Sequence, residues 1–332
     1  MNVVLLSTYE LGRQPFGLAS PAAWLRRAGA HVACADLSRQ PLPADAVRAA
    51  GLIAFYLPMH TATRLAVQAL RVIRQLNPGA HLCFYGLYAP MNEAYLRSLG
   101  TQTILGGEFE AGLVKLVERL RRGNGGFVGA GLQPGRIADQ EEGVSTPDVP
   151  VAQPEPLISL DRLAFIPPDR SGLPPLDLYA KLLLPGGPRT VGYTEASRGC
   201  KHLCRHCPIV PVYNGVFRIV PREVVLADVR QQVSAGAEHI TFGDPDFFNG
   251  PGHALEIVRA LHREFSQLTY DVTIKVEHLL KHSEHLTTLR ETGCLFVTTA
   301  VESIDDAVLA RLHKGHTRAD FLEAVRRCRE AG

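Results

Sequence analysis

Apolar runs of strand length alternate with longer amphipathic segments over the first 122 residues. The apolar runs predict strands at residues 2–6, 31–35, 52–57, 81–85 and 103–105, and the amphipathic segments predict helices at 21–29, 61–76, 93–99 and 111–122. Strands separated by helices of this length are typical of a parallel, doubly wound sheet. Such sheets bind ligands outside the carboxyl ends of their strands, so we expect a site there.

The same alternation begins again near residue 189 and continues to residue 332. It predicts strands at 190–195, 239–242, 272–276 and 295–301, and helices at 221–235, 254–265, 283–292, 305–312 and 318–330. The pattern therefore predicts a second α/β unit over residues 189–332.

Residues 123–188 have a different composition. Eleven of the 23 prolines fall between residues 134 and 188. Such a segment buries little apolar surface of its own and is typical of an interdomain connector. Two apolar stretches within it, 157–165 and 176–184, are expected to pack onto the second unit. The chain thus divides into a first domain (1–122), a connector (123–188) and a second domain (189–332).

The overall composition excludes several classes of protein. A net charge of +2 in 332 residues does not indicate nucleic-acid binding, which would need a concentrated basic patch. No apolar run approaches the roughly 18 residues of a membrane span, and the first residues resemble a strand more than a signal peptide. Seven cysteines, an odd number with three close together, argue against a disulfide framework. We therefore expect a cytoplasmic protein with no membrane partner.

The three clustered cysteines, Cys200, Cys204 and Cys207, have the spacing Cys-x3-Cys-x2-Cys. A short loop with this spacing can present three thiolates to one metal centre. Structural zinc is normally held by a closed tetrahedral set of Cys and His ligands, and His202 and His206 lie within the same loop. An iron–sulfur cluster on three cysteines would instead leave one iron open to another ligand. The spacing alone leaves both alternatives open.

The context of this loop resembles the radical S-adenosylmethionine (SAM) superfamily. The cysteines follow a predicted strand, and the resemblance continues through residues 241–245 (Thr-Phe-Gly-Asp-Pro), 301–303 (Val-Glu-Ser) and 309–315 (Leu-Ala-Arg-Leu-His-Lys-Gly). It implies a partial (β/α) barrel in which the three thiolates hold a 4Fe-4S cluster and the open iron binds SAM. It also implies that the cluster, reduced by a flavodoxin-type or ferredoxin-type electron donor, cleaves SAM to start radical chemistry.

The resemblance also assigns roles to side chains outside the cysteine loop. Gly243 and Asp244 occupy the place of the family's Gly-Gly-Glu-type motif, which meets the methionyl ammonium of SAM. Glu302 and Ser303 resemble the family's Glu-Ser pair near the SAM ribose and carboxylate. Other residues expected near SAM are His206, close to the adenine, and Lys275 or Glu277 at the end of the third barrel strand.

The first domain resembles the cobalamin-binding domain that precedes many radical SAM barrels. The resemblance rests on residues 17–21 (Gly-Leu-Ala-Ser-Pro), 85–89 (Tyr-Gly-Leu-Tyr-Ala) and 107–110 (Gly-Glu-Phe-Glu). Many such domains have an Asp-x-His-x-x-Gly loop after the first strand, whereas residues 8–12 here are Thr-Tyr-Glu-Leu-Gly. Either cobalamin binds without a loop histidine, or the domain keeps the fold without the cofactor.

The resulting prediction is a radical SAM enzyme that modifies an unidentified small molecule or peptide by methyl transfer, rearrangement or a related step. One alternative is transfer of the 3-amino-3-carboxypropyl group of SAM to a small molecule, because the layout is similar to a family with a cysteine- or selenocysteine-containing tail. A second alternative is a non-catalytic zinc-binding protein. Radical SAM barrels have about six β/α units, so we expect the barrel here to be truncated at its C-terminus.

Overall fold

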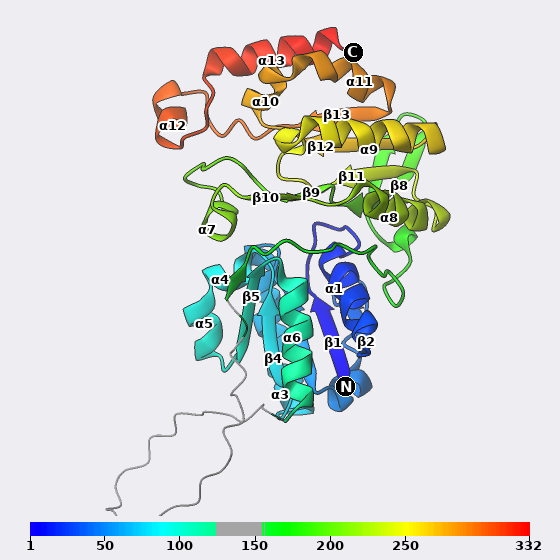
Figure 1. Cartoon of the computed structure of the whole chain (residues 1–332), viewed down its shortest axis with the longest axis vertical. Helices are drawn as coiled ribbons and strands as arrows, with labels where there is room; N and C mark the ends of the chain where they lie inside the picture. Colours follow the sequence, from blue (N-terminus) through cyan, green and yellow to red (C-terminus); the bar gives the residue numbers. More distant parts are fainter. Residues whose placement is uncertain (124–154, 156) are drawn as a thin grey trace, which may run out of the picture.

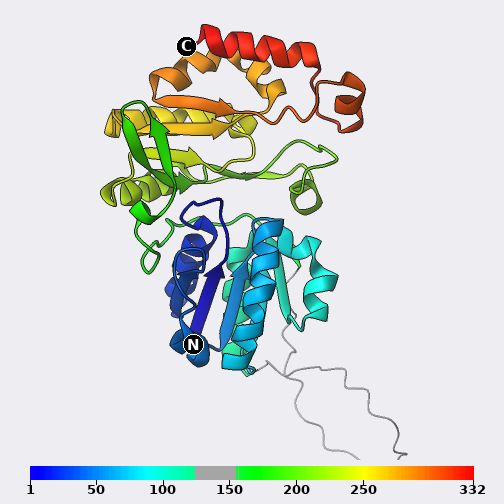
Figure 2. The same cartoon turned by 180° about the vertical axis from the view of Figure 1, so that it is seen from behind.

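The computed structural model describes residues 1–123, 155 and 157–332. Two α/β units are stacked along the long axis of the molecule, with the N-terminus in one unit and residue 332 in the other (Figures 1 and 2). Both units have the predicted parallel strands and covering helices. None of the described helices is both long enough and apolar enough to cross a membrane.

The first unit is a six-stranded parallel sheet with the order β2-β1-β3-β4-β5-β6. Its strands are β1 (Asn2–Ser7), β2 (His31–Asp36), β3 (Leu52–Tyr56), β4 (His81–Tyr85), β5 (Thr103–Gly107) and β6 (Ile158–Ser159). Chain order reverses between β1 and β3, which makes the carboxyl ends of these two strands the expected ligand crevice of a doubly wound sheet.

Helices cover both faces of this sheet and enclose two apolar cores. One face carries α1 (Phe16–Arg27) and α6 (Phe109–Arg121). The other carries α2 (Ala44–Ala49), α3 (His60–Leu76), α4 (Tyr88–Met91) and α5 (Glu93–Ser98). The sequence pattern did not predict α2 and α4, which are short.

Helix α1 begins five residues before the predicted start. Pro21, which was expected in the first turn, therefore lies inside the helix. A proline there cannot donate to the carbonyl four residues earlier, which belongs to Gly17. The buried hydroxyl of Tyr85 donates a hydrogen bond of 2.8 Å to that carbonyl. A side chain from β4 therefore replaces the backbone bond that Pro21 removes.

The described part of the predicted connector is shared between the two units. Its first apolar stretch adds β6 to the sheet of the first unit, and Leu157 packs against the core there, so the expected packing onto the second unit is wrong for this residue. Glu155 is bound to Arg119 of α6 by two hydrogen bonds of 2.9 and 2.8 Å. The second stretch behaves as predicted, since Leu176 joins the core of the second unit.

The second unit is a five-stranded sheet with the order β13-β12-β11-β8-β7, parallel except for the antiparallel pair β7 and β8. Its strands are β7 (Lys181–Leu184), β8 (Gly187–Thr194), β11 (His239–Phe242), β12 (Thr269–Thr273) and β13 (Cys294–Thr298). Strand β12 ends at Thr273, three residues before the predicted end of this strand. Lys275 and Glu277 therefore lie at the start of a helix rather than at a strand end.

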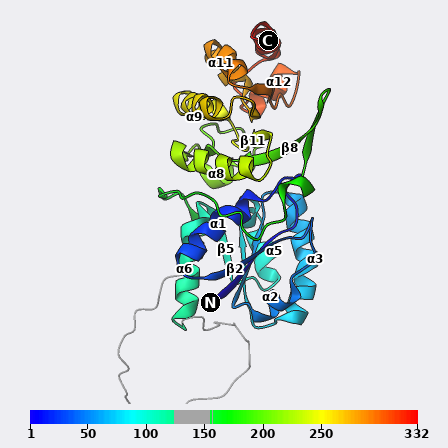
Figure 3. The ribbon, with the colours of Figure 1, turned by 90° about the vertical axis from the view of Figure 1, so that its right-hand side faces the viewer.

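Helices pack along the outer side of this sheet, where α8, α9 and α11 lie one above another (Figure 3). The helices of this unit are α7 (Val210–Tyr213), α8 (Arg222–Ser234), α9 (Pro251–Glu264), α10 (Val276–Lys281), α11 (Leu286–Glu291), α12 (Asp306–Arg311) and α13 (Arg318–Glu330). A separate antiparallel ribbon of β9 (Ser197–Gly199) and β10 (Phe217–Ile219) lies beside the sheet.

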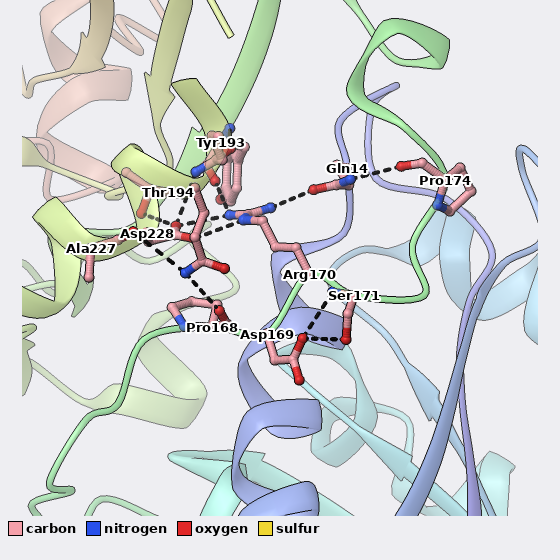
Figure 4. Close-up of polar contacts among 12 residues, drawn as sticks. Gln14, Pro168, Asp169, Arg170, Ser171, Pro174, Tyr193, Thr194, Ala227 and Asp228 are labelled. Atoms are coloured by element: carbon pink, nitrogen blue, oxygen red, sulfur yellow. Dashed lines mark hydrogen bonds and ion pairs between the residues drawn. The ribbon is translucent and has the colours of Figure 1, made fainter. Parts of the chain in front are cut away.

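Arg170 joins the two units through one guanidinium group (Figure 4). It forms a bidentate ion pair of 2.8 and 2.9 Å with Asp228 of α8 and donates a 2.7 Å hydrogen bond to the carbonyl of Tyr193 in β8. It also donates a 2.8 Å hydrogen bond to Gln14, which follows β1 in the first unit. This contact holds the loop after β1 against the first strand of the barrel.

Candidate active site between the two units

The three clustered cysteines lie on a loop that is anchored at both ends by the β9–β10 ribbon. The loop begins at Cys200, directly after β9, and it leads into α7. Gly199 has a φ of +73°, and a Cβ atom there would lie 2.4 Å from the carbonyl oxygen of Val216. Only glycine therefore fits the point where the ribbon turns into the cysteine loop.

All three thiols of this loop are free, and peptide N–H groups point at two of them. Burial raises the pKa of the Cys200 and Cys207 thiols, while hydrogen bonds from the backbone of His202 to Cys200, and of Ile209 and Val210 to Cys207, act in the opposite direction. N–H donors of this kind stabilise thiolates and tune the potential of iron–sulfur clusters. The donor set thus fits a cluster held by three cysteines.

A polar cluster that the sequence analysis missed supports the loop from behind. Asp246, which is 1% exposed, lies 2.6 Å from Nδ1 of His278 and 3.3 Å from Nε2 of His202. Burial opposes the charge on Asp246, but the two imidazoles together lower its pKa to about 2. Lys275 Nζ lies 2.9 Å from Nδ1 of His202 and 3.1 Å from Glu277. The predicted residues Lys275 and Glu277 thus reach the cysteine loop through His202.

Cys200, His202 and Asp246 also place three potential metal-ligating atoms within 4.8 Å of one another. It is one of two such groups among the described residues, the other being His282, Glu284 and His285. His202 and His278 both lie within ion-pair distance of the Asp246 carboxylate, at 3.3 and 2.6 Å, so His202 can also act as a support of the loop.

Gly243 and Asp244 follow β11, as predicted, and lie against the strand that precedes the cysteines. Asp244 is 2% exposed and accepts hydrogen bonds of 2.9 Å from the Ala196 amide and 2.6 Å from the Ser197 hydroxyl. Burial raises its pKa to about 6 despite these bonds. A Cβ atom on Gly243 would lie 1.8 Å from the Tyr193 hydroxyl. In this structure both residues fix the backbone at the start of the cysteine loop.

His206 and Glu302, predicted from opposite ends of the barrel sequence, meet in the structure. Their Nε2 and Oε1 atoms are 3.1 Å apart, and Lys314 Nζ lies 3.5 Å from the same carboxylate oxygen. Glu302 has a φ of +69°, a left-handed conformation that is strained for a residue with a side chain. Ser303 accepts a hydrogen bond of 3.1 Å from the Asp305 amide instead of joining this group.

Arg198, two residues before Cys200, connects the cysteine loop to the first unit. It is 6% exposed and binds Glu110 at 2.8 Å, Glu108 at 3.2 Å and Glu195 at 2.9 Å. Burial raises the pKa of both Glu108 and Glu195 to about 7, although Arg198 opposes the shift. Glu108 and Glu110 belong to the segment that resembles a cobalamin domain, and here they hold the cysteine loop against the first unit.

A cavity of about 240 Å³ lies between the units, beside the Arg198 cluster. The loop after β1 contributes Glu10 and Arg13 to its wall. The aromatic and polar residues of the wall include Tyr56, Phe109, Tyr193, Glu195 and Arg198, and the rest of the wall is aliphatic, methionine, proline or glycine residues. The cavity therefore lies at the β1/β3 crevice of the doubly wound sheet and at the strand that carries the cysteine loop.

Residues 194–332 match the family described as the radical SAM superfamily, and this part of the chain is a radical SAM domain. The predicted radical SAM fold is thereby confirmed, and the match favours an iron–sulfur cluster over the zinc alternative on the three cysteines. The first unit is the doubly wound domain that the sequence predicted before the barrel.

Curated relatives match less than half of the chain, at low identity. The ribosomal protein uS12 methylthiotransferase RimO of Geobacter sulfurreducens is 26% identical over 156 residues, which are 44% of this chain and 34% of that protein. A hopanoid C-2 methylase of Rhodopseudomonas palustris is 23% identical over 141 residues, which are 41% of this chain and 27% of that protein. The chain thus spans about a third of the length of these relatives.

Solved structures of cobalamin-dependent enzymes share the whole two-unit fold. The radical SAM methyltransferase TsrM from Kitasatospora setae, with tryptophan and a SAM analogue bound, has a TM-score of 0.69 at 19% identity, covering 100% of this chain and 66% of that chain. The cobalamin-dependent SAM radical enzyme OxsB has a TM-score of 0.67 at 14% identity, covering 99% of this chain and 48% of that chain. At this identity the likeness establishes the fold.

Proposed function

We propose that this protein is a cobalamin-dependent radical SAM enzyme that transfers a methyl group to a small-molecule or peptide substrate. One observation carries the proposal. Strand β9 lines the cavity between the units with Ser197, Arg198 and Gly199, and the next residue is the first cysteine of the loop. A cluster on the loop and a cofactor in the cavity would therefore lie close together, and methyl transfer that involves both requires such proximity.

Cys200, Cys204 and Cys207 are proposed to hold a 4Fe-4S cluster, which supplies the electron that cleaves SAM when both are bound. The protein positions this group: the His202, Ile209 and Val210 amides donate to the sulfurs. Asp246 fixes the imidazole of His202, and Asp244 fixes the backbone before the loop. These contacts would position the thiols in the metal-free protein.

The SAM-binding residues stay proposals that rest on the sequence resemblance. His206 and Glu302 are the best supported pair, because their contact brings the loop after β13 to the cysteine loop. The strained backbone at Glu302 is consistent with a functional position. Gly243, Asp244, Lys275 and Ser303 complete the proposed set; Gly243 and Asp244 would act by shaping the loop rather than by offering a free side chain.

Cobalamin is proposed for the cavity between the units, and the residues there fit part of such a ligand. Tyrosine and phenylalanine side chains offer flat apolar walls, while Glu10 and Arg13 offer polar groups for a ring bordered by carboxamides. A volume of about 240 Å³ admits only part of a corrin ring, so the rest would lie outside this cavity. TsrM and OxsB, which share the fold, have structures with cobalamin bound.

The proposal includes an external electron donor of the flavodoxin or ferredoxin type and a reducing, cytoplasmic setting, which seven free cysteines support. No described feature selects the substrate. Transfer of the 3-amino-3-carboxypropyl group stays a prediction from the sequence.

Anaerobic reconstitution with iron and sulfide tests the cluster. We expect a brown protein with roughly four irons per chain, and we expect the Cys204→Ala variant to lose the colour while Cys328→Ala retains it. A colourless protein that binds stoichiometric zinc would overturn the proposal. A parallel incubation with hydroxocobalamin, followed by gel filtration, tests the second cofactor through the corrin absorbance that elutes with the protein.

A further inference from the structure

The loop after β1 places an acidic side chain where many cobalamin domains have a histidine. Glu10 is 7% exposed and lines the cavity between the units. Its Oε2 atom is buried and has no hydrogen-bond partner among the described residues. A buried polar atom without a partner costs free energy, so it points to a ligand that would supply the missing contact.

We infer that Glu10 recognises the corrin ring, by donating a hydrogen bond from its carboxylic acid to a carbonyl oxygen of a peripheral carboxamide. This inference rests on the proposed function, since it names a residue that would hold the proposed cofactor. The chemistry is complementary because a neutral carboxylic acid can donate and accept at once, and a primary carboxamide offers both an acceptor and donors.

The groups around Glu10 favour the neutral acid. Burial raises its pKa to about 8, and the Glu195 and Asp36 carboxylates add to the shift while Arg13 opposes it. The Tyr56 and Tyr193 side chains face the same carboxyl group, and burial raises the pKa of both phenols well above the usual value. These groups are all uncharged or anionic except Arg13, so at neutral pH Glu10 keeps its proton and can donate it in a hydrogen bond.

The surrounding contacts fix the loop that carries Glu10. Arg13 lies over the Tyr193 ring at 5.0 Å, and Gln14 is bound to Arg170 at 2.8 Å and to the Pro174 carbonyl at 2.9 Å. The loop is therefore held by the barrel and the connector and does not depend on Glu10 itself. Replacing Glu10 should alter the cavity wall while leaving the fold in place.

The test is the affinity for cyanocobalamin, whose axial ligand does not titrate near neutral pH. Equilibrium dialysis between pH 6.5 and 9.5 compares the wild-type protein with Glu10→Gln, which keeps a neutral donor, and Glu10→Leu, which has no polar group. We expect the wild-type affinity to fall as the pH rises through about 8, since the acid then loses its proton. Glu10→Gln should bind with nearly constant affinity, and Glu10→Leu should bind about tenfold more weakly than wild type at pH 6.5.

Two results separate the inference from the proposed function. If wild type retains no corrinoid at any pH, the cobalamin part of the proposed function fails, and the inference fails with it. If wild type binds but Glu10→Leu binds equally well at every pH, the inference alone is overturned. Iron content after reconstitution and the thermal unfolding midpoint show that each variant is folded.

Discussion

Replacement of Arg198 by methionine should destabilise the protein far more than the loss of an ordinary surface ion pair. In the structure one guanidinium is shared by three carboxylates, of which Glu108 and Glu110 are fully buried. Removing one partner from a buried ion pair costs about 3–5 kcal/mol, because the remaining charge has no counterion and little water. We expect the Arg198→Met variant to lose about this much free energy of unfolding at pH 8.

The loss should depend on pH in a defined direction. Burial raises the pKa of Glu108 and Glu195 to about 7 even with Arg198 present. Without the guanidinium both pKa values rise above 7, so in the folded variant the two acids begin to take up protons above pH 7, and the electrostatic penalty shrinks as the pH falls towards 7. The difference in stability between wild type and Arg198→Met should therefore be larger at pH 8 than at pH 6.

Urea denaturation at both pH values measures this difference. Arg222→Met is the matched control, because Arg222 is half exposed and its ion pair with Glu223 lies at the surface; it should cost less than about 1 kcal/mol at either pH. Adding Glu110→Gln to the Arg198→Met variant should recover part of the stability. The reasoning is refuted if Arg198→Met costs no more than the control, or if its deficit grows on acidification.

Three further changes test other contacts. Cys204→Ser should leave the reconstituted protein without the absorbance of a cluster, whereas Cys328→Ser should keep it; equal absorbance in both would remove Cys204 from the ligand set. Tyr85→Phe should lower the free energy of unfolding by about 1–2 kcal/mol by leaving a buried helix carbonyl unpaired, while Tyr95→Phe, at an exposed site, should change nothing measurable in the same urea titration. Gly243→Ala should destabilise by about 1–3 kcal/mol, since the added methyl overlaps the Tyr193 ring; a thermal midpoint equal to wild type would show that the ring moves freely.

The elements that the sequence predicted best are those whose pattern is local. The bounds of β4, β11 and α13 agree with the prediction, because each has a continuous apolar run or a regular amphipathic stripe with polar or glycine residues at its ends. The cysteine loop was also predictable, because its three cysteines lie within eight residues of sequence and their spacing can be read without the rest of the chain.

The start of α1 could not be predicted in the same way. A proline usually marks the first turn of a helix, so Pro21 indicated a start there. The earlier start depends on the Tyr85 hydroxyl, which comes from a strand 64 residues later in the chain and satisfies the carbonyl that proline leaves free. Periodicity within a window of the sequence does not contain this information.

The buried charges between the units were missed for a related reason. Glu10, Glu108 and Glu195 are ordinary acidic residues at or near strand ends; in the structure Glu10 and Glu108 are buried and Glu195 is partly buried, close to the junction of the two units. The sequence does give a local signal in Arg198, which lies between Ser197 and Gly199, two residues before Cys200. A cationic side chain at this place needs an acidic partner if it is buried. The identity of that partner is a property of the domain interface.

The segment of residues 124–154 has a consequence for engineering that follows from β6. Helix α6 ends at Arg121, and the chain next described, at Glu155, is bound to Arg119 of the same helix before it enters the sheet of the first unit. The described residues on either side of the segment therefore belong to the first unit, and the chain crosses to the second unit between β6 and β7. A reporter domain or an affinity tag inserted between residues 124 and 154 would therefore be flanked on both sides by residues of the first unit, and the crossing from β6 to β7 would keep its length.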